Sequence, residues 1–301
     1  MLTVSSISRS FGGHRVLDRV SFTVRPGRMT GFLGANGAGK TTAMRIILGV
    51  LAAQEGSVTF DGRPVTGALR QTFGYMPEER GLYPKMKVAE QIAWLGELHG
   101  LDRPTARANT ERLLDQLELG ERADDPLEQL SLGNQQRAQI AAALVHDPVL
   151  LILDEPFSGL DPIAVDTVLG VLRDRAAQGV PVLFSSHQLA VVEQLCDDLV
   201  IISGGRIVAE GEREQVRSRY GPVRFELEVD TDAGWVRDVP GVRVVDLDGA
   251  RAVFEADDGT ASATDGAALG DRVLRTALDR GRVRSFTPVV PSLDEIFKEV
   301  V

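Results

Sequence analysis

Short apolar runs alternate with longer segments through the first two-thirds of the chain. Several of these runs are almost entirely apolar, which is typical of strands that are covered on both faces of a sheet. The segments between them have the length and spacing of helices, so we predict an α/β fold for this part of the chain. The predicted strands are residues 20–24, 29–33, 57–60, 149–153, 180–185 and 199–202.

The pattern becomes mostly helical between Pro84 and Pro148. Leu113, Leu114 and Leu117 recur there at the spacing of one helix face. We therefore predict a helical insertion, about residues 84–148, between elements of the sheet. Simple core packing also explains these leucines, so the insertion by itself indicates no function.

The composition changes near Tyr220-Gly221-Pro222, which predicts two domains, residues 1–220 and 221–301. Over residues 223–229 apolar and charged positions alternate, as in a half-buried strand. Ser292 and Glu295 have capping-box spacing, which predicts a last amphipathic helix over residues 293–300. With further strands predicted at 242–247, 250–256 and 282–287 and a helix at 267–280, the tail is predicted to be a small α+β domain.

Composition and charge narrow the classes of function. Apolar residues make up 43% of the chain and charged residues 25%, as in ordinary soluble globular proteins. The 33 Lys and Arg against 43 Asp and Glu give a formal net charge of -10. The tail from Gly221 is also acidic, with 10 basic and 16 acidic residues. Because such a chain has no general attraction for nucleic acid, we expect no nucleic-acid partner.

The single cysteine, Cys196, excludes an internal disulfide and a cysteine-based metal cluster. We interpret it as a small buried helix residue rather than a catalytic thiol. No apolar stretch has the length of a membrane span. The N-terminal residues 1–6 lack the basic and apolar regions of a signal peptide. Any action at a membrane is therefore expected from outside the lipid.

Residues 34–41 match the phosphate-binding pattern G-x-x-x-x-G-K-[ST] in full, between an apolar strand and a helical segment. A glycine-rich backbone can turn its N–H groups toward phosphate oxygens, and the helix N-terminus adds positive charge. Lys40 would supply a full charge to the β- and γ-phosphates, and the Thr41 hydroxyl would bind Mg²⁺. The competing interpretation is a chance glycine-rich turn. The predicted ATP-binding residues are Gly34, Ala35, Asn36, Gly37, Ala38, Gly39, Lys40, Thr41 and Thr42.

A pair of carboxylates, Asp154 and Glu155, directly follows the apolar run 149–153. Carboxylates at the end of a buried strand are costly unless they serve an ion or a reaction. We expect Asp154 to hold Mg²⁺, directly or through water, and Glu155 to act as the general base that orients the attacking water. A solvated acidic turn is the alternative interpretation.

A third motif narrows the class of NTPase. Residues 130–137 read Leu-Ser-Leu-Gly-Asn-Gln-Gln-Arg and resemble the signature motif of ATP-binding-cassette (ABC) proteins, usually L-S-G-G-Q. Ser131 and Gly133 keep the family pattern, whereas Leu132 and Asn134 depart from it. A serine that caps an ordinary helix is the simpler interpretation of the motif alone. Its position shortly before the strand of Asp154 favours the ABC resemblance.

Other positions agree with this resemblance. Residues 158–161 are similar to the family's D-loop, which ends at Asp161. His187 is similar to the switch histidine that touches the γ-phosphate, and with Lys40 and Glu155 it completes the expected catalytic set. Phe11 matches the aromatic residue that stacks on adenine, with Val16 beside it. Taken alone, Phe11 would be interpreted as a core residue.

Glu78 stands where the family usually has a glutamine. By resemblance it would bind Mg²⁺ together with Thr41 and Asp154. The stretch 74–84 around it resembles a bacterial subgroup of ABC ATPases, the sodium-efflux type, which pairs with ABC-2-type permeases. The tail resembles the C-terminal domain often attached to that subgroup. The resemblance therefore covers nearly the whole chain.

The resemblance implies an α/β fold of the P-loop NTPase type: an ABC cassette with a helical subdomain, followed by the small α+β domain. It implies ATP and Mg²⁺ as ligands. It also implies that two ATPase subunits, as a homodimer or a heterodimer, close head to tail around two nucleotides. In that arrangement Ser131, Gly133, Asn134 and Asp161 act in trans on the ATP of the opposite subunit.

The leading functional hypothesis is therefore the ATPase subunit of an ABC exporter at the cytoplasmic face of the cell membrane. A separate polytopic permease is the expected partner, docked on residues 81–100. The alternative is a soluble ABC ATPase that acts on ribosomes or DNA. The single cassette, the lack of zinc cysteines and the acidic charge argue against it. A purely regulatory cassette is disfavoured because Lys40, Asp154, Glu155 and His187 are all present.

Overall fold

The computed structural model describes residues 1–79, 81–186, 189–220, 223–256, 263–289 and 292–300. Contacts within the chain divide these residues into two compact units, Met1–Arg213 and Glu214–Val300. The predicted boundary at Gly221 falls on residues 221–222, outside the described part of the chain. Each unit has its own sheets, helices and apolar core, and each is described by itself below.

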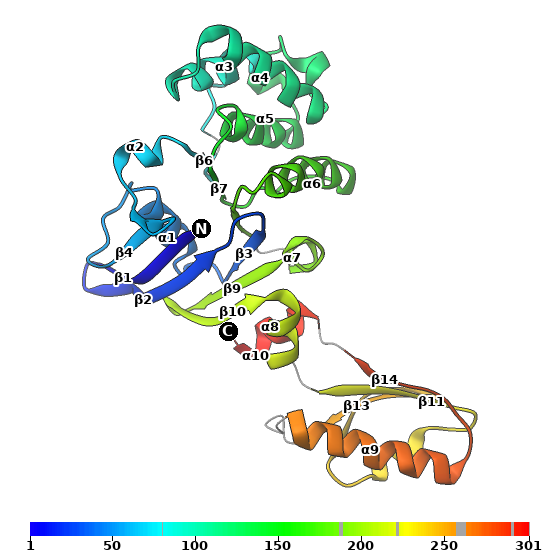
Figure 1. Ribbon diagram of the computed structural model, residues 1–301. Helices are drawn as coiled ribbons and strands as arrows, with labels where there is room; N and C mark the ends of the chain where they lie inside the picture. The colour runs from blue at the N-terminus through cyan, green and yellow to red at the C-terminus, as the bar shows by residue number, and fades with distance from the viewer. Residues whose placement is uncertain (80, 187–188, 221–222, 257–262, 290–291, 301) are drawn as a thin grey trace. The chain divides into compact units, whose positions relative to one another are not determined.

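An antiparallel sheet opens the first unit (Figure 1). Its first strand pairs with the second and fourth, and it escaped sequence-based prediction because Ser5 and Ser6 interrupt its apolar alternation. Ser6 has a φ of 50°, and the pairing register shifts between Val4 and Ile7. In sheet order the strands are β2 (His14–Val24), β1 (Leu2–Phe11), β4 (Glu55–Phe60) and β5 (Arg63–Pro64).

The first unit also contains a sheet of six strands, and residues that follow several of these strands form the candidate functional site. Four of its strand pairs are parallel, so the carboxyl ends of β3, β6, β7, β8 and β9 meet at one edge. Strand β10 pairs antiparallel with β9 at the border of the sheet. In sheet order the strands are β10 (Arg206–Glu212), β9 (Asp198–Ser203), β3 (Met29–Leu33), β8 (Val182–Ser185), β7 (Leu150–Leu153) and β6 (Phe73–Met76).

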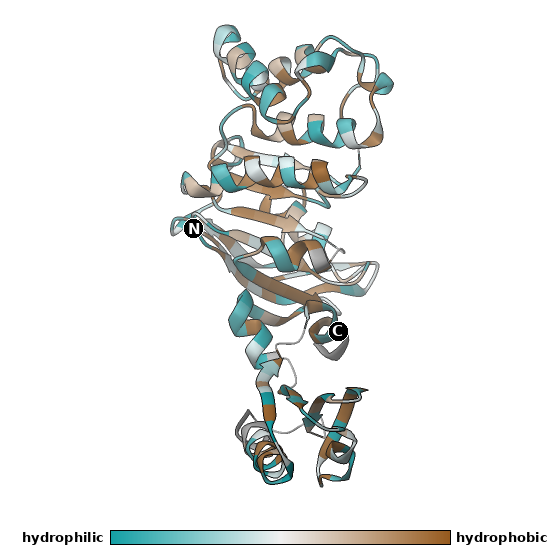
Figure 2. Cartoon of the chain, turned by 90° about the vertical axis from the view of Figure 1, so that its right-hand side faces the viewer, coloured by the Kyte–Doolittle hydropathy of each residue, from teal (hydrophilic) through white to brown (hydrophobic). Residues whose placement is uncertain are grey.

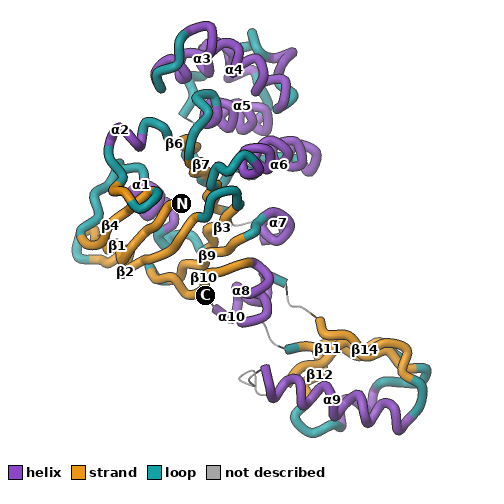
Figure 3. The backbone as a smooth tube through the Cα atoms, in the orientation of Figure 1, coloured by secondary structure: helices purple, strands orange, loops and turns teal. Residues whose placement is uncertain are grey.

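The helical segments of the insertion form one group next to β6 (Figure 3). They lie in the chain between β6 and β7, which are adjacent in the sheet with Phe73 opposite Leu150. The chain therefore leaves the sheet and returns beside the strand that it left. These helices are α3 (Val88–Leu98), α4 (Arg103–Gln116), η1 (Gly120–Arg122), η2 (Leu127–Gln129) and α5 (Leu132–Leu144).

The other helices flank the sheets. Between the antiparallel sheet and the parallel one, Phe22, Phe32, Met44 and Ile152 belong to one apolar core. In Figure 2 the strands are mostly brown, the colour of hydrophobic residues, and the helices mix brown with teal. These helices are α1 (Lys40–Ile47), α2 (Gly67–Arg70), α6 (Pro162–Ala177) and α7 (Leu189–Leu195). Helix α8 (Arg213–Tyr220) begins where the chain passes from the first unit to the second.

Cys196 is buried, with 2% of its surface exposed. Burial raises the pKa of its thiol well above the ordinary value, which keeps the thiol protonated and unreactive. Its predicted place within a helix is wrong by one residue, because α7 ends at Leu195 and Cys196 lies in the turn that leads into β9.

The second unit is an antiparallel sheet covered by one long helix. Leu227 and Phe254 on the sheet pack with Val273 and Ala277 of the helix in a separate core. The last helix begins with the predicted capping box, since Ser292 N–H donates to Glu295 Oε2 at 3.0 Å and Glu295 N–H to Ser292 Oγ at 3.4 Å. The elements are β11 (Arg224–Val229), η3 (Gly234–Asp238), β12 (Val242–Asp248), β13 (Arg251–Ala256), α9 (Ala263–Arg280), β14 (Val283–Val289) and α10 (Leu293–Val300), with sheet order β12-β13-β11-β14.

Charged pairs join the strands of the sheet in the second unit. Glu255, only 2% exposed, is paired with both Arg224 and Arg243. Arg224 also pairs with Glu295 of α10 and thereby lowers the pKa of that carboxyl. The same arginine therefore ties the last helix to the sheet.

Among the helices of the described residues, none is both long and apolar enough to cross a bilayer.

Candidate functional site

The loop between β3 and α1 has the geometry of a phosphate cradle. Gly37 and Gly39 adopt φ values of 81° and 111°, a region that other residues rarely occupy. A Cβ atom on Gly39 would stand 2.6 Å from Leu17 Cδ2, so no larger residue fits there without a shift. The glycines thus let the loop turn tightly just before the first N–H groups of α1.

The ammonium group of Lys40 lies inside this loop. Lys40 is 8% exposed, and its Nζ donates to the carbonyl oxygens of Gly34 at 2.6 Å and Ala35 at 3.3 Å. A positive charge is therefore held among backbone carbonyls at the start of a helix. An anion placed in the loop would meet this ammonium together with the helix N-terminus.

Asp154 follows β7 directly and connects the first turn of α1 to the end of β8. Its Oδ2 accepts a hydrogen bond from Thr41 Oγ1 at 3.0 Å, and its Oδ1 accepts one from Ser185 Oγ at 2.5 Å. The carboxylate is 1% exposed. Neighbouring carboxylate and hydroxyl oxygens are the ligands that Mg²⁺ prefers, so the donor set of Thr41 and Asp154 fits that ion.

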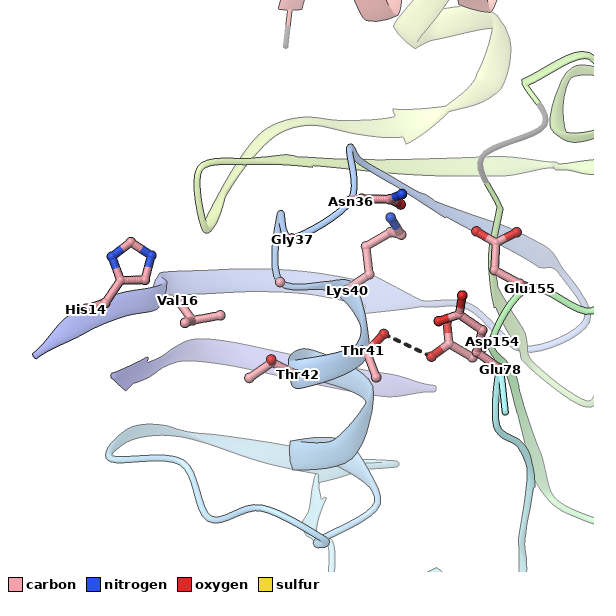
Figure 4. Close-up of a pocket in the computed structure, with 11 residues that line it drawn as sticks. His14, Val16, Asn36, Gly37, Lys40, Thr41, Thr42, Glu78, Asp154 and Glu155 are labelled. Carbon is pink, nitrogen blue, oxygen red and sulfur yellow. Dashed lines mark hydrogen bonds between the residues drawn. The ribbon is translucent and has the colours of Figure 1, made fainter. Parts of the chain in front are cut away.

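Glu155 is held through its backbone on both sides. Its φ of 54° lies in the left-handed region, which costs energy for any residue with a Cβ. Its N–H donates to Ser185 Oγ at 2.9 Å, and its carbonyl accepts from Gln136 Nε2 at 3.0 Å. These bonds stabilise the unusual turn at Glu155, whose side chain, 8% exposed, lines the same pocket as Lys40 (Figure 4).

These groups line one pocket of about 470 Å³ (Figure 4). The structure therefore brings together residues from the phosphate loop, the end of β7 and the segment after β6. Of the residues predicted from the sequence, the lining includes Val16, Asn36, Gly37, Gly39, Lys40, Thr41, Thr42, Glu78, Asp154 and Glu155. Gly34, Ala35 and Ala38 belong to the same loop but do not line the cavity.

Phe11 is not part of that lining. It is 43% exposed, and the guanidinium carbon of Arg9 lies 4.8 Å from its ring centroid. The cavity is lined instead by His14, which pairs with Phe11 across the Gly12-Gly13 turn of the β1–β2 hairpin. His14 was not singled out in the sequence. The signal available in the sequence was the position of His14 just beyond the Gly12-Gly13 pair that follows Phe11, the residue predicted to stack on adenine.

The signature residues lie outside the pocket of their own chain. Ser131 is exposed and caps α5, its Oγ accepting from Asn134 N–H at 3.3 Å, and Gly133 and Asn134 are half-buried. Asp161 is exposed and caps α6 by accepting from Ala164 N–H at 2.8 Å. None of these four residues lines the cavity of Lys40. His187, the predicted switch histidine, lies outside the described residues.

Two buried side chains that support the site were missed in the sequence. Ser185 ends β8 and touches both acidic residues, and Gln136 lies in α5 behind Glu155. A polar residue at the end of an apolar strand was a usable signal for Ser185. Gln136 carries no such signal, because its contact depends on how α5 packs.

The helical insertion presents a separate apolar surface, formed by Tyr83, Trp94 and Leu98. These side chains are 56%, 39% and 63% exposed, and the two aromatic rings meet edge to face with centroids 6.0 Å apart. Gln91, 1% exposed, fixes the turn at Tyr83 by accepting from its N–H at 3.0 Å. Nearby, a cavity of about 310 Å³ is lined by residues of β6, α3 and α5 and of the segments after β6 and α5, among them Leu82, Leu95, Gln139 and His146.

Comparison with known families gives two matches along the chain. Residues 17–158 match the family described as ABC transporter. Residues 211–301 match the C-terminal domain of DrrA1-3-like ATP-binding proteins. The two matched segments lie in the same order as the two compact units.

Relatives and solved structures agree with these matches. The ABC transporter ATP-binding protein YhaQ of Bacillus subtilis (strain 168) is 36% identical over 100% of this chain and 98% of its own length. Nod factor export ATP-binding protein I of Ralstonia nicotianae is 33% identical over 81% of this chain and 75% of its own length. A solved ATP-binding subunit of an ABC transporter superposes with a TM-score of 0.68 at 32% identity, covering 73% of this chain and 93% of that one.

Proposed function

Since this chain belongs to the ATP-binding subunits of ABC transporters, a family of ATPases coupled to transport, we propose that the pocket around Lys40 hydrolyses ATP to drive an exporter. The observation that carries the proposal is the hydrogen bond between Thr41 and Asp154, 3.0 Å long. It joins the phosphate loop to the acidic strand end in one cavity, together with the ammonium of Lys40.

Each group around the cavity has a proposed role. Lys40 and the N–H groups at the start of α1 bind the phosphates of ATP. Thr41, Asp154 and Glu78 supply oxygen ligands for Mg²⁺, which adds positive charge beside the phosphates when it is bound. Glu155 orients a water molecule and accepts its proton. His187 is proposed to contact the γ-phosphate.

The base of the nucleotide is proposed to lie at the β1–β2 hairpin. Val16 lines the cavity and offers an apolar contact. Phe11 supplies the stacking surface that the sequence pattern predicts, and its 43% exposure leaves the ring open to a ligand. His14 lies opposite Phe11 in the hairpin and is the nearer of the two to the phosphates, since it lines the cavity.

A second ATPase subunit is required for the complete site in this proposal. Ser131, Gly133, Asn134 and Asp161 are outside the cavity of their own chain, and Ser131 and Asp161 are exposed. They are therefore available to the ATP of an opposing subunit, in a homodimer or a heterodimer. Donors from both subunits would offset the cost of burying the phosphate charges between them.

The permease is proposed to dock on the apolar surface of Tyr83, Trp94 and Leu98. Exposed aromatic residues of this kind are enriched at protein interfaces. Gln91 holds the turn beneath Tyr83, so the surface has a fixed shape. It lies in the segment between Glu78 and the signature helix, so a movement of the ATP site would reach it. The subunit would then act at the cytoplasmic face of the cell membrane.

Export is the proposed direction of transport. The similarity to Nod factor export ATP-binding protein I over 81% of this chain supports it. The cargo itself would be contacted by the permease rather than by the pocket of Lys40.

Affinity purification of the full chain from gently solubilised native membranes tests the proposal. A polytopic membrane protein in stoichiometric amount is expected, and it should be lost when Trp94 is changed to Ser. The matched control is Val50→Ser, which removes another exposed apolar side chain (66% exposed) far from this surface in the sequence. Recovery of ribosomal or DNA-repair proteins without a membrane protein would overturn the transporter assignment.

A further inference from the structure

Gln136 connects the signature helix to the backbone of Glu155. It lies in α5, five positions after the Ser131 cap, and is 5% exposed. Its Nε2 donates to the carbonyl oxygens of Glu155 and of Pro156, each at 3.0 Å. Both N–H bonds of one buried amide are thus used to hold the turn that directs Glu155.

That turn needs external support. Glu155 has a φ of 54°, in a region that residues with a Cβ rarely adopt. Such a conformation persists only where the surroundings fix it. Ser185 holds the N–H side of the residue at 2.9 Å and Gln136 the carbonyl side at 3.0 Å. A shift of Gln136 would therefore change where the carboxylate of Glu155 stands.

Helix α5 also carries signature residues, which are proposed to contact the ATP of the opposing subunit. Gly133 precedes Gln136 by three positions, which is less than one helical turn, so the two move together. One turn further on, Gln139 Nε2 donates to the carbonyl of Glu79 at 3.4 Å, next to the proposed Mg²⁺ ligand Glu78. Helix α5 therefore contacts two segments of its own chain that line the pocket of Lys40: the one after β7, at Glu155, and the one after β6, at Glu79 beside Glu78.

We infer that Gln136 is a positioning residue that couples the two ATP sites of the proposed dimer. This inference rests on the proposed function. In such a dimer, Ser131 and Gly133 of one chain contact the ATP held by its partner, whereas Glu155 of that chain acts on the ATP that it holds itself. Gln136 joins these two contacts within one chain. Binding of ATP at one site then sets the position of the general base at the other site, and in a homodimer the two-fold symmetry makes this effect mutual.

The test uses the purified full chain carrying Gln136→Met, which keeps the side-chain length and removes both donors. Gln136→Glu is the second variant, because an ionised carboxylate keeps the volume and cannot donate to the two carbonyls. ATP hydrolysis is measured as a function of ATP concentration. For the wild type a Hill coefficient of about 1.5–2 is expected. Both variants should give a value near 1, a kcat about tenfold lower and a KM changed by less than about threefold.

Two further measurements separate coupling from general damage. The ATP-dependent dimer that forms in a Glu155→Gln background should persist when Gln136→Met is added, because the phosphate loop and the signature are intact. Asn109→Leu is the control for loss of a side-chain amide in the helical insertion. Asn109 Nδ2 donates to the Val145 carbonyl at 2.8 Å and to Asp147 Oδ2 at 3.0 Å, away from the cavity of Lys40. This control should keep the Hill coefficient of the wild type.

The failures are distinguishable. A Hill coefficient of 1 in an active wild type, or an unchanged coefficient in both Gln136 variants, would overturn the coupling and leave the proposed function standing. A wild type that hydrolyses no ATP, or a Lys40→Ala variant as active as the wild type, would overturn the proposed function and the coupling with it.

Discussion

Thr41 Oγ1 donates a hydrogen bond to Asp154 Oδ2 across 3.0 Å, joining residues that are 113 positions apart in the chain. Thr41 belongs to the first turn of α1, and Asp154 directly follows β7. Because β3 and β7 are parallel strands of one sheet, separated by β8, their carboxyl ends lie at the same edge. The contact is therefore a consequence of strand order, and it lies where we propose that the metal and the phosphates bind.

Lys40→Ala removes the one charged side chain among residues 34–41 of the phosphate loop. ATP hydrolysis should fall by at least about a hundredfold, since charge-assisted contacts to phosphate carry much of such catalysis. Phosphate release and binding of a fluorescent ATP analogue measure the two parts of the effect. Lys87→Ala is the control, because Lys87 is exposed and paired with Asp124 in the helical insertion. Turnover close to that of the wild type in Lys40→Ala would refute the phosphate-site assignment.

Glu155→Gln should trap an ATP-bound dimer. The amide keeps the size of the side chain but accepts no proton, so hydrolysis should slow by about a hundredfold or more while binding persists. Sedimentation velocity with and without ATP measures the association. A variant that stays monomeric at saturating ATP would contradict the two-subunit model, and Glu121→Gln in η1 serves as a control for loss of a carboxylate.

Ser185→Ala should weaken both stability and turnover. It removes a donor to the buried Asp154 carboxylate and an acceptor for the Glu155 N–H, bonds of 2.5 and 2.9 Å. The expected loss is about 2–3 kcal/mol in the free energy of unfolding and about tenfold in kcat. Urea denaturation and steady-state kinetics measure the two effects. Ser5→Ala, at an exposed position of β1, should change the free energy of unfolding and kcat only slightly.

His146 should make the protein less stable in acid. Burial and the stacked ring of His99, 3.7 Å away between centroids, lower the pKa of His146 to about 4. Between about pH 6.5 and pH 4 the unfolded chain then binds more protons than the folded one at this residue, so the free energy of unfolding falls as the pH falls. The expected size is about 1–3 kcal/mol, reduced by the partial exposure of the ring.

Urea denaturation at pH 7.5 and pH 5 measures this effect. In His146→Gln the difference between the two pH values should shrink, whereas His14→Gln, at an exposed position, should leave it unchanged. Equal pH dependence in His146→Gln and the wild type would show that other groups carry the acid sensitivity. The Phe73 carbonyl, 3.2 Å from His146 Nε2, and the adjacent Asp147 favour the charged form and oppose the shift.

Arg224→Met should destabilise the second unit. It leaves the carboxylate of Glu255, 2% exposed, with Arg243 as its remaining arginine partner, and it frees Glu295 from the sheet. Loss of one partner of a buried pair costs about 3–5 kcal/mol. Trp235 fluorescence in a Trp94→Phe background reports unfolding of this unit in urea. The double variant Arg224→Met/Glu255→Met should recover most of the loss, and no recovery would contradict the buried-charge explanation.

Local features of the sequence predicted the phosphate loop and its surroundings. The strand at residues 29–33 is observed as predicted, and the capping box of Ser292 and Glu295 forms. Each of these features depends on residues close together in the chain, so a short pattern contains the interaction. The strand of residues 2–11 was missed because its pairing with two other strands, rather than its own alternation, stabilises it.

The support of the site could not be predicted in the same way. The sequence pattern predicts Phe11 beside the nucleotide, and that role stays a prediction; His14, which no motif singled out, lines the cavity, whereas Phe11 lies against Arg9. Which of these hairpin residues lines the cavity depends on how the hairpin packs beside the loop of Lys40, and no short pattern encodes that packing. Cys196 shows the same limit on a small scale, since the apolar run around it does not reveal where α7 ends.

The sequence by itself determined where the residues of the proposed site stand along the chain: glycines where the loop must turn, Lys40 at the start of the helix that follows, and two carboxylates after an apolar strand. These follow from spacing along the chain, because each acts through neighbouring residues. Only the tertiary structure decided that Ser185 binds both Asp154 and Glu155, and that Gln136 holds Glu155 from the signature helix. Those contacts join segments that strand order and helix packing bring together, and no local periodicity encodes that order.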